Sequence, residues 1–274
     1  MLTSITANMN TLSLRWILLF IATSIPHFSN AQESEFETNL KLPWKQVFFD
    51  KGNEDWQNRW FLDGQRAWIK NMEDGMLYSA GPIEKDDACH AVLWTKQSFT
   101  GDLKIEYDYT RMDNIQKAVN IIYIQATGKE EGPYSKDISE WSHMRTIPYM
   151  RTYFTNMKLL HISYAAFTND DAKGKLDYVR ARRYPVLPGQ NFGRDTRVGE
   201  SYDNTGLFIP GVKYHITILK KGDKLFMKVA GDGKSTLFNW DYSDHPRITE
   251  GRIGLRHMWT RCSKYANFSV SELE

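Results

Sequence analysis

The feature that most constrains the fold is a series of short segments in which apolar and polar residues alternate, separated by Gly, Pro, Asn and Asp. Successive side chains of a β-strand point to opposite faces, so this pattern predicts strands with one buried face. The expected strands are Gln46–Asp50, Gly75–Ser79, Ala91–Lys96, Gly101–Arg111, Val119–Ala126, Leu159–Phe167, Leu176–Tyr184, Lys213–Lys220, Lys224–Ala230, Gly251–Arg256 and Tyr265–Leu273. The sequence therefore predicts an all-β sandwich of two antiparallel sheets.

The N-terminus has the pattern of a secretory signal peptide, which we place at residues 1–31. Arg15 precedes the apolar run Trp16–Ala22, and the small residues Ser29–Ala31 suit a cleavage site. This run is too short to span a membrane, and no other stretch approaches spanning length. We therefore expect an exported protein, secreted or periplasmic, without a membrane span.

The remaining sequence is expected to form one domain. Residues 32–43 are polar and are predicted to be a loose leader, whereas residues 44–274 carry the strand pattern. The net charge is only +2, which argues against a nucleic-acid partner. Aromatic residues make up 14% of the chain, and this high content favours surfaces that stack on sugars. The oligomeric state is left open.

The cysteines and acidic clusters give no sign of a metal site. Cys89 and Cys262 form either one disulfide or a pair of free buried thiols in an exported protein. Neither lies in a CxxC or HxxxH spacing, and the acidic stretches Glu84–Asp87 and Asp241–Asp244 lack EF-hand order. We therefore expect no metal and no cofactor.

The segment Asp177–Pro185 is an expected strand with two contrasting faces. Val179 and Ala181 form a small apolar face, with Arg183 at the fraying end. The opposite face carries Tyr178, Arg180, Arg182 and Tyr184. One face would pack a core while the other meets an anion. The alternative is a solvated face on which arginine stems cover neighbouring aromatic rings.

Four further candidates come from other predicted strands. His161 and Arg256 each point away from the apolar side chains of their own strand. Trp94 is either a platform for a sugar ring or a core tryptophan. Gln125 is expected near the same surface, although the sequence does not settle which face of its strand it occupies.

One loop, Gly128–Met157, is longer than connections in compact domains usually are. Such loops are commonly functional, and a short helical turn is expected around Asp137–Met144. The loop contributes His143 and Arg151 to the candidate site.

These side chains fit abstraction of the proton next to a uronate carboxylate. An arginine neutralises the carboxylate, and a Tyr or His whose pKa is tuned by positive charge acts as base. The group at C4 then leaves, either as a sugar (a lyase) or as water (a dehydratase). The expected catalytic residues are His161, Tyr184, Arg182 and His143, and the expected substrate-binding residues are Arg180, Arg256, Trp94, Gln125, Tyr178 and Arg151.

Two other functions remain open. The same arginines and aromatic rings would serve a non-catalytic module that binds acidic glycans. Glu106 and Asp108 resemble part of the acid motif of jelly-roll glycoside hydrolases, but Thr110 stands where that motif has its second glutamate. Glycoside hydrolysis is therefore the weakest of the three.

The sequence resembles the YesU-like family over about Trp44–Val270. Its most specific matches are Val179–Pro185 (VRARRYP) and Gly251–Met258 (GRIGLRHM), with further matches at Trp60–Gly64, His90–Thr95 and Leu160–Ala165. This family is known as a domain of unknown function with a concanavalin A-like jelly-roll fold. A similar protein from ulvan breakdown is an oligosaccharide dehydratase. The resemblance thus implies a jelly roll that acts by β-elimination on uronate-containing, sulfated oligosaccharides such as those of ulvan, and it transfers no catalytic residue.

Overall fold

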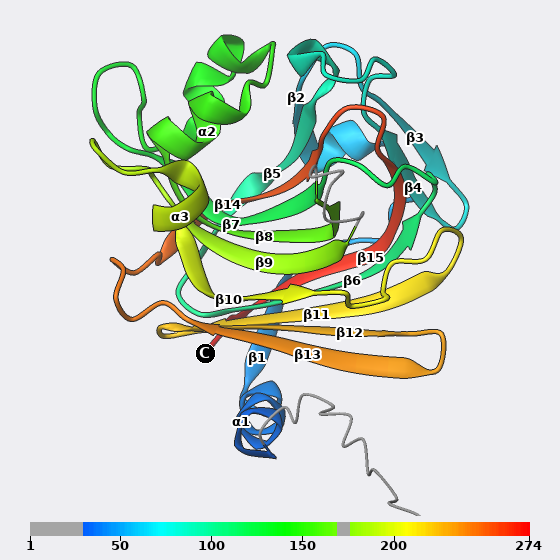
Figure 1. Ribbon diagram of the computed structural model, residues 1–274, viewed down its shortest axis with the longest axis vertical. Coiled ribbons are helices and arrows are strands. Elements are labelled where there is room, and N and C mark those ends of the chain that lie inside the picture. The colour runs from blue at the N-terminus through cyan, green and yellow to red at the C-terminus, as the bar shows by residue number, and fades with distance from the viewer. Residues whose placement is uncertain (1–29, 169–175) are drawn as a thin grey trace, which may run out of the picture.

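The computed structural model describes residues 30–168 and 176–274, which form two antiparallel β-sheets packed face to face (Figure 1). The eight-stranded sheet has the order β13 (Lys234–Asp241), β12 (Lys224–Gly231), β11 (Lys213–Lys221), β6 (Leu103–Arg111), β15 (Cys262–Leu273), β4 (Gly75–Ser79) and β3 (Trp68–Met72), with β1 (Trp44–Asp50) also paired to β15. The seven-stranded sheet has the order β10 (Arg197–Asp203), β9 (Asp177–Tyr184), β8 (Met157–Phe167), β7 (Asn120–Gly128), β14 (Glu250–His257), β5 (Ala91–Thr100) and β2 (Trp60–Asp63). The predicted jelly-roll sandwich is confirmed.

The main core lies between the two sheets. Val179 and Ala181 of β9 are fully buried in the same cluster as Ile105 of β6 and Ile218 of β11. Each buried valine or isoleucine side chain contributes roughly 1.5–3 kcal/mol when it leaves water. A slip of β9 by one residue would exchange these side chains for arginines, so burial fixes its register.

Four strands were not among those expected, and each lies at an end of a sheet. They are β3 and β13 in the eight-stranded sheet and β2 and β10 in the seven-stranded sheet. Edge strands are commonly short or polar, which limits pairing with other chains. For that reason they carry a weaker alternation than the interior strands.

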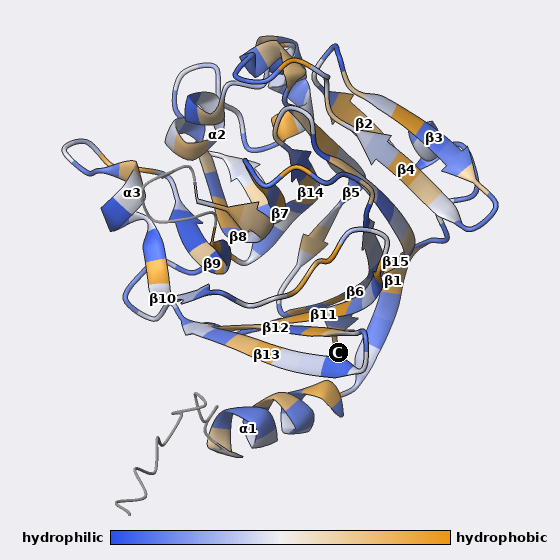
Figure 2. Ribbon diagram, turned by 45° about the vertical axis from the view of Figure 1, so that its right-hand side comes forward, coloured by the Kyte–Doolittle hydropathy of each residue, from blue (hydrophilic) through white to orange (hydrophobic). Residues whose placement is uncertain are grey.

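The N-terminal segment differs from the expected loose leader, because α1 (Asn30–Leu40) packs on the outside of the eight-stranded sheet (Figure 2). Phe36 is fully buried in a cluster with Leu219, Phe226 and Leu237. Lys228 adds ion pairs to Glu33 and Glu37 at 3.0 and 2.8 Å. Apart from Asn30 and Ala31, the predicted signal peptide lies outside the described residues. Within residues 30–168 and 176–274, no helix combines the length and apolarity needed to cross a membrane.

The cysteines do not form a disulfide. Cys89, at the end of the short 3₁₀ helix η2 (Asp87–Cys89), is buried, and Cys262 is half-buried; both are free thiols. Burial raises the pKa of the Cys262 thiol. Of the two alternatives that the sequence left open, the structure therefore has the pair of free thiols.

The long loop Gly128–Met157 folds over the outer face of the seven-stranded sheet (Figure 1). It contains the 3₁₀ helix η3 (Ile138–Arg145), as predicted, and the short helix α2 (Met150–Asn156), which was not expected. We call Ile138–Asn156 the cap. Its position decides which of the predicted site residues reach solvent.

Candidate functional site

Several predicted site residues lie on the outer face of the seven-stranded sheet, as strand alternation requires, but the cap covers them. We call this group the covered layer; it consists of Trp94, Tyr123, His161, Tyr184 and Arg256, with Tyr153 from the cap. None of these side chains is more than 2% exposed. The sequence predicts that this face meets an anion, which requires it to be open. The structure instead closes it, because the aromatic residues of the cap pack on this face and exclude water from it.

Two buried or half-buried ion pairs hold the cap on the sheet. Asp63 at the end of β2 accepts hydrogen bonds from Arg145 Nε at 2.6 Å and from the Tyr153 hydroxyl at 2.9 Å. Burial raises the pKa of Asp63 despite the Arg145 charge. Arg252 of β14 pairs with Asp137, just before η3, at 2.9 Å. Neither Asp63 nor Arg145 was among the predicted site residues, although Asp63 lies within the Trp60–Gly64 match to the family.

Trp94 is a structural residue rather than a sugar platform. Its ring is nearly parallel to the rings of Tyr123 and Tyr153, with centroids 5.5 and 6.4 Å away. Its Nε1 donates to Asp63 Oδ2 at 2.7 Å. The core alternative for this tryptophan is therefore correct.

His161 and Tyr184 form a buried hydrogen-bonded pair. His161 Nδ1 lies 2.7 Å from the Tyr184 hydroxyl, and its Nε2 lies 2.6 Å from Ser163 Oγ. Burial, and then the charges of Arg182 and Arg256, hold the pKa of His161 well below its usual range, so the ring is neutral at pH 7. Burial raises the pKa of Tyr184 well above its usual value, and the nearby arginines do not overcome this. Positive charge therefore does not lower the pKa of Tyr184 as the proposed role of a base requires, whereas neutral His161 can accept a proton.

Arg182 stabilises a neighbouring helix instead of facing an open site. Its Nη1 donates to the carbonyls of Phe192 and Gly193 at 2.9 and 3.1 Å and to Thr196 Oγ1 at 2.9 Å. Its guanidinium lies 4.6 Å from the centre of the Phe192 ring. These contacts fix α3 (Phe192–Asp195), so the assignment of Arg182 as carboxylate clamp is not supported.

Arg180 and Tyr178 lie near the β10 edge and are both half-buried. The Arg180 guanidinium lies 4.3 Å from the centre of the Tyr178 ring, and its Nε donates to Ser201 Oγ at 2.9 Å. Burial raises the pKa of Tyr178. Alternation placed them correctly, but they line none of the cavities described below.

Gln125 and His143 are not part of the candidate site. A register shift in β7 interrupts alternation at Gln125, whose amide donates to the carbonyls of Phe99 and Gly101 at 3.3 and 3.0 Å. His143 is exposed on η3 and is not among the residues lining the groove. The assignment of Gln125 depended on a regular strand, and that of His143 depended on an open sheet face. The structure has neither.

A groove of about 1040 Å³ lies at the end of the sandwich where β9 leaves the sheet. Its walls come from α2, from the segment Pro185–Asn191, from α3 and from the connection between β13 and β14. The cations that line it are Lys129, Arg151, Lys158, Arg183 and Arg247. Of the predicted site residues, Arg151 lies here.

Arg183 and Arg151 are the groove's unpaired cations. Arg183 is only 7% exposed, and its Nε donates to the Pro246 carbonyl at 3.0 Å. Burial lowers its pKa to about 10, so it stays charged at neutral pH. Neither it nor exposed Arg151 has a carboxylate partner among the described residues. The other three are paired within the chain: Lys129 with Glu131, Lys158 with Glu130 and Arg247 with Asp223.

An aromatic wall separates the groove from the covered layer. Phe154 of α2 and Phe192 of α3 both line the groove and stack with ring centroids 4.6 Å apart. Behind them, the Tyr184 ring lies 6.4 Å from Phe154 and 6.0 Å from Phe192. The buried His161–Tyr184 pair is therefore one aromatic layer away from the groove.

Sequence reasoning underrated Arg183. It shares the inward face of its strand with Val179 and Ala181, and an arginine on that face must reach an open end of the core. Its position, two residues after Ala181 on the same strand, could therefore have identified it as a candidate site residue. Nothing in the sequence showed that the β13–β14 connection would meet it there.

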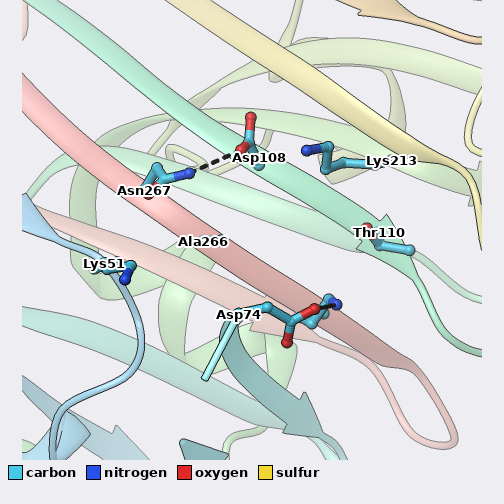
Figure 3. A pocket seen from close by; sticks show the side chains of 8 residues that line it. Lys51, Asp74, Asp108, Thr110, Lys213, Ala266 and Asn267 are labelled. Atoms are coloured by element: carbon cyan, nitrogen blue, oxygen red, sulfur yellow. Dashed lines mark hydrogen bonds and ion pairs between the residues drawn. The ribbon is translucent and has the colours of Figure 1, made fainter. Parts of the chain in front are cut away.

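A smaller cavity of about 240 Å³ lies on the outer face of the eight-stranded sheet (Figure 3). Asp108 lines it and accepts hydrogen bonds from Asn267 Nδ2 and His215 Nδ1, both at 2.9 Å. Glu106, on the same face, pairs with Lys104 at 2.9 Å. The two acids that the glycoside-hydrolase alternative required are therefore already paired with other side chains of the protein. They lie on the eight-stranded sheet, whereas the covered layer lies on the seven-stranded sheet.

The fold defines the class of the protein as a concanavalin A-like β-sandwich, the class that includes legume lectins. It is similar to the VIP36 exoplasmic/lumenal domain in its Ca²⁺/Man3GlcNAc-bound form, with 11% identity, 84% of this chain and 90% of that chain covered, and a TM-score of 0.54. It is also similar to lectin UEA-II complexed with galactose, with 6% identity, 83% of this chain and 99% of that chain covered, and a TM-score of 0.53. At these identities the likeness establishes the fold alone.

The chain belongs to the family described as Domain of unknown function (DUF1961), which matches residues 51–270. A protein of unknown function with a galectin-like fold from Bacillus subtilis is similar at 16% identity, covering 83% of this chain and 97% of its own, with a TM-score of 0.59. The resemblance inferred from the sequence motifs is therefore confirmed for the domain family and for the fold. No curated protein matches the chain.

Proposed function

We propose that this protein is exported and binds acidic oligosaccharides in the groove, and that its ligands are uronate-containing, sulfated saccharides of the kind found in ulvan. One observation carries the proposal. Arg183 is a nearly buried cation that faces the groove without a carboxylate partner among the described residues. A desolvated guanidinium gains most from a carboxylate or sulfate, which it can hold in a charge-assisted hydrogen bond.

The rest of the groove suits a saccharide. Its volume of about 1040 Å³ lies at the upper end of the range for ligand sites, so it has room for more than one sugar ring. Phe154 and Phe192 give an apolar wall, and exposed Arg151 supplies a second charge near the rim. Lectins of known structure with the same fold bind sugars, which adds support at the level of the class.

The test is a binding titration of the mature protein with ulvan, alginate and neutral cello-oligosaccharides. We expect acidic ligands to bind, neutral ones to bind at least tenfold more weakly, and affinity to fall as salt screens the charges. Arg183→Met should lower affinity for the acidic ligand about 10–100-fold, the loss of one charged hydrogen bond of about 1.5–3 kcal/mol. Arg66→Met, which removes an exposed arginine outside the groove, should leave affinity unchanged. Equal binding by wild type and Arg183→Met would refute the proposal.

A second function, β-elimination on the same saccharides, is favoured by a different observation. A neutral histidine, His161, lies in a hydrogen bond with Tyr184 one aromatic layer behind the groove wall. In this reaction the base takes the C5 proton of the uronate and the C4–C5 double bond forms. The C4–O bond breaks, and the departing oxygen takes a proton to leave as water or as the hydroxyl of a shortened chain. His161 would reach C5 only when Phe154 and Phe192 move apart.

Turnover decides between binding alone and binding with elimination. The mature protein is incubated with the oligosaccharide that binds best, and the unsaturated uronate is followed by its ultraviolet absorbance and by mass. Loss of one water indicates a dehydratase, whereas two fragments indicate a lyase. His161→Gln should abolish product formation with binding retained and circular dichroism unchanged. A wild type that binds every acidic ligand tightly and forms no unsaturated product would reject the second function and leave the first intact.

A further inference from the structure

Arg256 carries an unusual buried charge beneath the cap. Its side chain is fully buried, and its Nε and Nη1 groups make no well-formed hydrogen bond among the described residues. The guanidinium lies 4.7 Å from the centre of the Tyr153 ring and interacts with the hydroxyl of Tyr123, so its charge is in contact with tyrosines rather than with an acid. Only Nη2 makes well-formed hydrogen bonds, donating to the Pro148 carbonyl at 2.7 Å and to His90 Nδ1 at 3.0 Å. Buried N–H groups of a guanidinium are costly to leave without acceptors, so such groups point to a missing partner.

No carboxylate among the described residues pairs with Arg256. Asp63, the buried acid beside the covered layer, shares its Oδ2 among Arg145, Trp94 and Tyr153, and its Oδ1 accepts no hydrogen bond from Arg256 or from any other described group. The groups nearest Arg256 are neutral at pH 7. Burial lowers the pKa of His90 to about 3, and burial raises the pKa of Tyr123 to about 12.

We propose that Arg256 anchors a second anion site on the covered face, which accepts a single carboxylate group of a sugar acid. The Pro148 carbonyl, at the start of the cap's second helix, occupies one donor of this guanidinium. A carboxylate is a stronger acceptor for an arginine than a neutral carbonyl. The ligand therefore replaces the Pro148 carbonyl, and the start of α2 moves away from the sheet.

The start of α2 is suited to such a movement. Its N-cap residue, Tyr149, makes no side-chain capping hydrogen bond and is 48% exposed. The ion pairs of the cap at Asp137 and Arg145 lie before this point, whereas Tyr153 holds the middle of α2 through Asp63. The movement is therefore confined to the first residues of α2, and η3 stays in place. The inference does not rest on the groove, because Arg256 is not among the groove residues.

The experiment measures amide hydrogen exchange of the mature protein with D-glucuronate, with D-glucose as the neutral control. We expect glucuronate to speed exchange in peptides covering Thr146–Asn156 in a saturable manner, and glucose to have no effect. Arg183→Met removes the groove's buried cation and should keep this response. Arg256→Met should abolish it, and Arg256→Lys, which retains the charge, should weaken the apparent affinity at least tenfold.

Melting temperature without ligand gives an independent readout. If Arg256 serves a ligand, methionine removes an unsatisfied buried charge, and Arg256→Met should melt no lower than the wild type. If its role is to hold Pro148, the variant should melt clearly lower, and that result overturns the proposal. An unchanged glucuronate response in Arg256→Met, or no response in the wild type, also overturns it. Loss of the glucuronate response in Arg183→Met would assign that response to the groove and refute the second site. Failure of oligosaccharide binding in the titration, with the glucuronate response intact, would refute only the proposed function.

Discussion

The covered layer and the groove are built from the same residue types, and two adjacent arginines of β9 show how differently they are used. Arg182 points to the outer face, and its guanidinium donates hydrogen bonds to backbone carbonyls of α3. Arg183 points inward to the open end of the core and faces the groove with no carboxylate partner in the described chain. The covered layer is thus mainly satisfied by the protein itself, Arg256 excepted, while the groove keeps charge for a ligand. A run of arginines therefore indicates function only after the partner of each one is known.

The largest expected effect tests whether the covered layer is structural. Asp63→Ala removes the acceptor shared by Arg145, Trp94 and Tyr153 and leaves a buried guanidinium unpaired. Breaking such a pair typically costs about 3–5 kcal/mol. We expect a loss of this size in the free energy of unfolding measured by urea denaturation.

The matched control is Asp203→Ala, which removes an exposed acid lying 3.9 Å from Arg180. Its effect should stay within about 0.5 kcal/mol, as for most surface substitutions. Similar stability of the two variants would mean that the cap does not depend on Asp63.

Acid should destabilise the fold through its buried histidines. Burial lowers the pKa of His90 and His257 to about 3 and holds that of His161 well below its usual range. In the unfolded chain they titrate near 6.5, so below that pH the unfolded state binds more protons. Stability should be complete above about pH 6.5 and should fall by up to about 1.4 kcal/mol per pH unit for each histidine as pH decreases toward the folded-state pKa.

Urea denaturation at pH 7 and pH 5 measures this loss. Asp63, whose pKa is raised in the folded protein, acts in the opposite direction and reduces the net slope. Stability that does not change between the two pH values would contradict the burial of neutral histidines.

The two adjacent arginines allow a direct comparison of binding with stability. Arg182→Met removes the side-chain donor to the Gly193 carbonyl and one of the two side-chain donors to the Phe192 carbonyl, and we expect a loss of about 1–3 kcal/mol in stability. Arg183→Met should instead lower oligosaccharide affinity, with a much smaller change in stability. Thermal melting and titration of both variants measure the two effects. A loss of affinity in Arg182→Met together with a loss of stability in Arg183→Met would contradict the roles assigned to the two arginines.

The smallest expected effect is a pH dependence of binding in the groove. His245 lines the groove, and burial and then the charge of Arg183 lower its pKa, with Asp244 opposing them. A bound anion offsets Arg183 and raises the pKa of His245, so binding takes up protons. Affinity for a sulfated ligand should therefore rise as pH falls from 7 to 5, by less than about tenfold, which corresponds to a shift of one pKa unit. His245→Gln should remove this dependence; if the slope persists, another group causes it.

The sequence by itself determined the interior of the sandwich. Alternation placed Val179 and Ala181 in the core and His161 on the opposite face, because a one-residue slip would bury charge. It also marked Gly128–Met157 as a loop with a role of its own. The four strands that it missed lie at sheet ends, where partial exposure weakens the alternation that reveals a strand.

Tertiary structure alone decided which side chains reach solvent. The cap is held by Asp63 and Arg145, which are far apart in the sequence, and its presence converts an expected open site into a covered layer. Arg183 faces the groove because the β13–β14 connection brings Pro246 beside it. Strand alternation is a local property and fixes the direction of a side chain, whereas its exposure and its ion partners depend on which distant segments pack against that face.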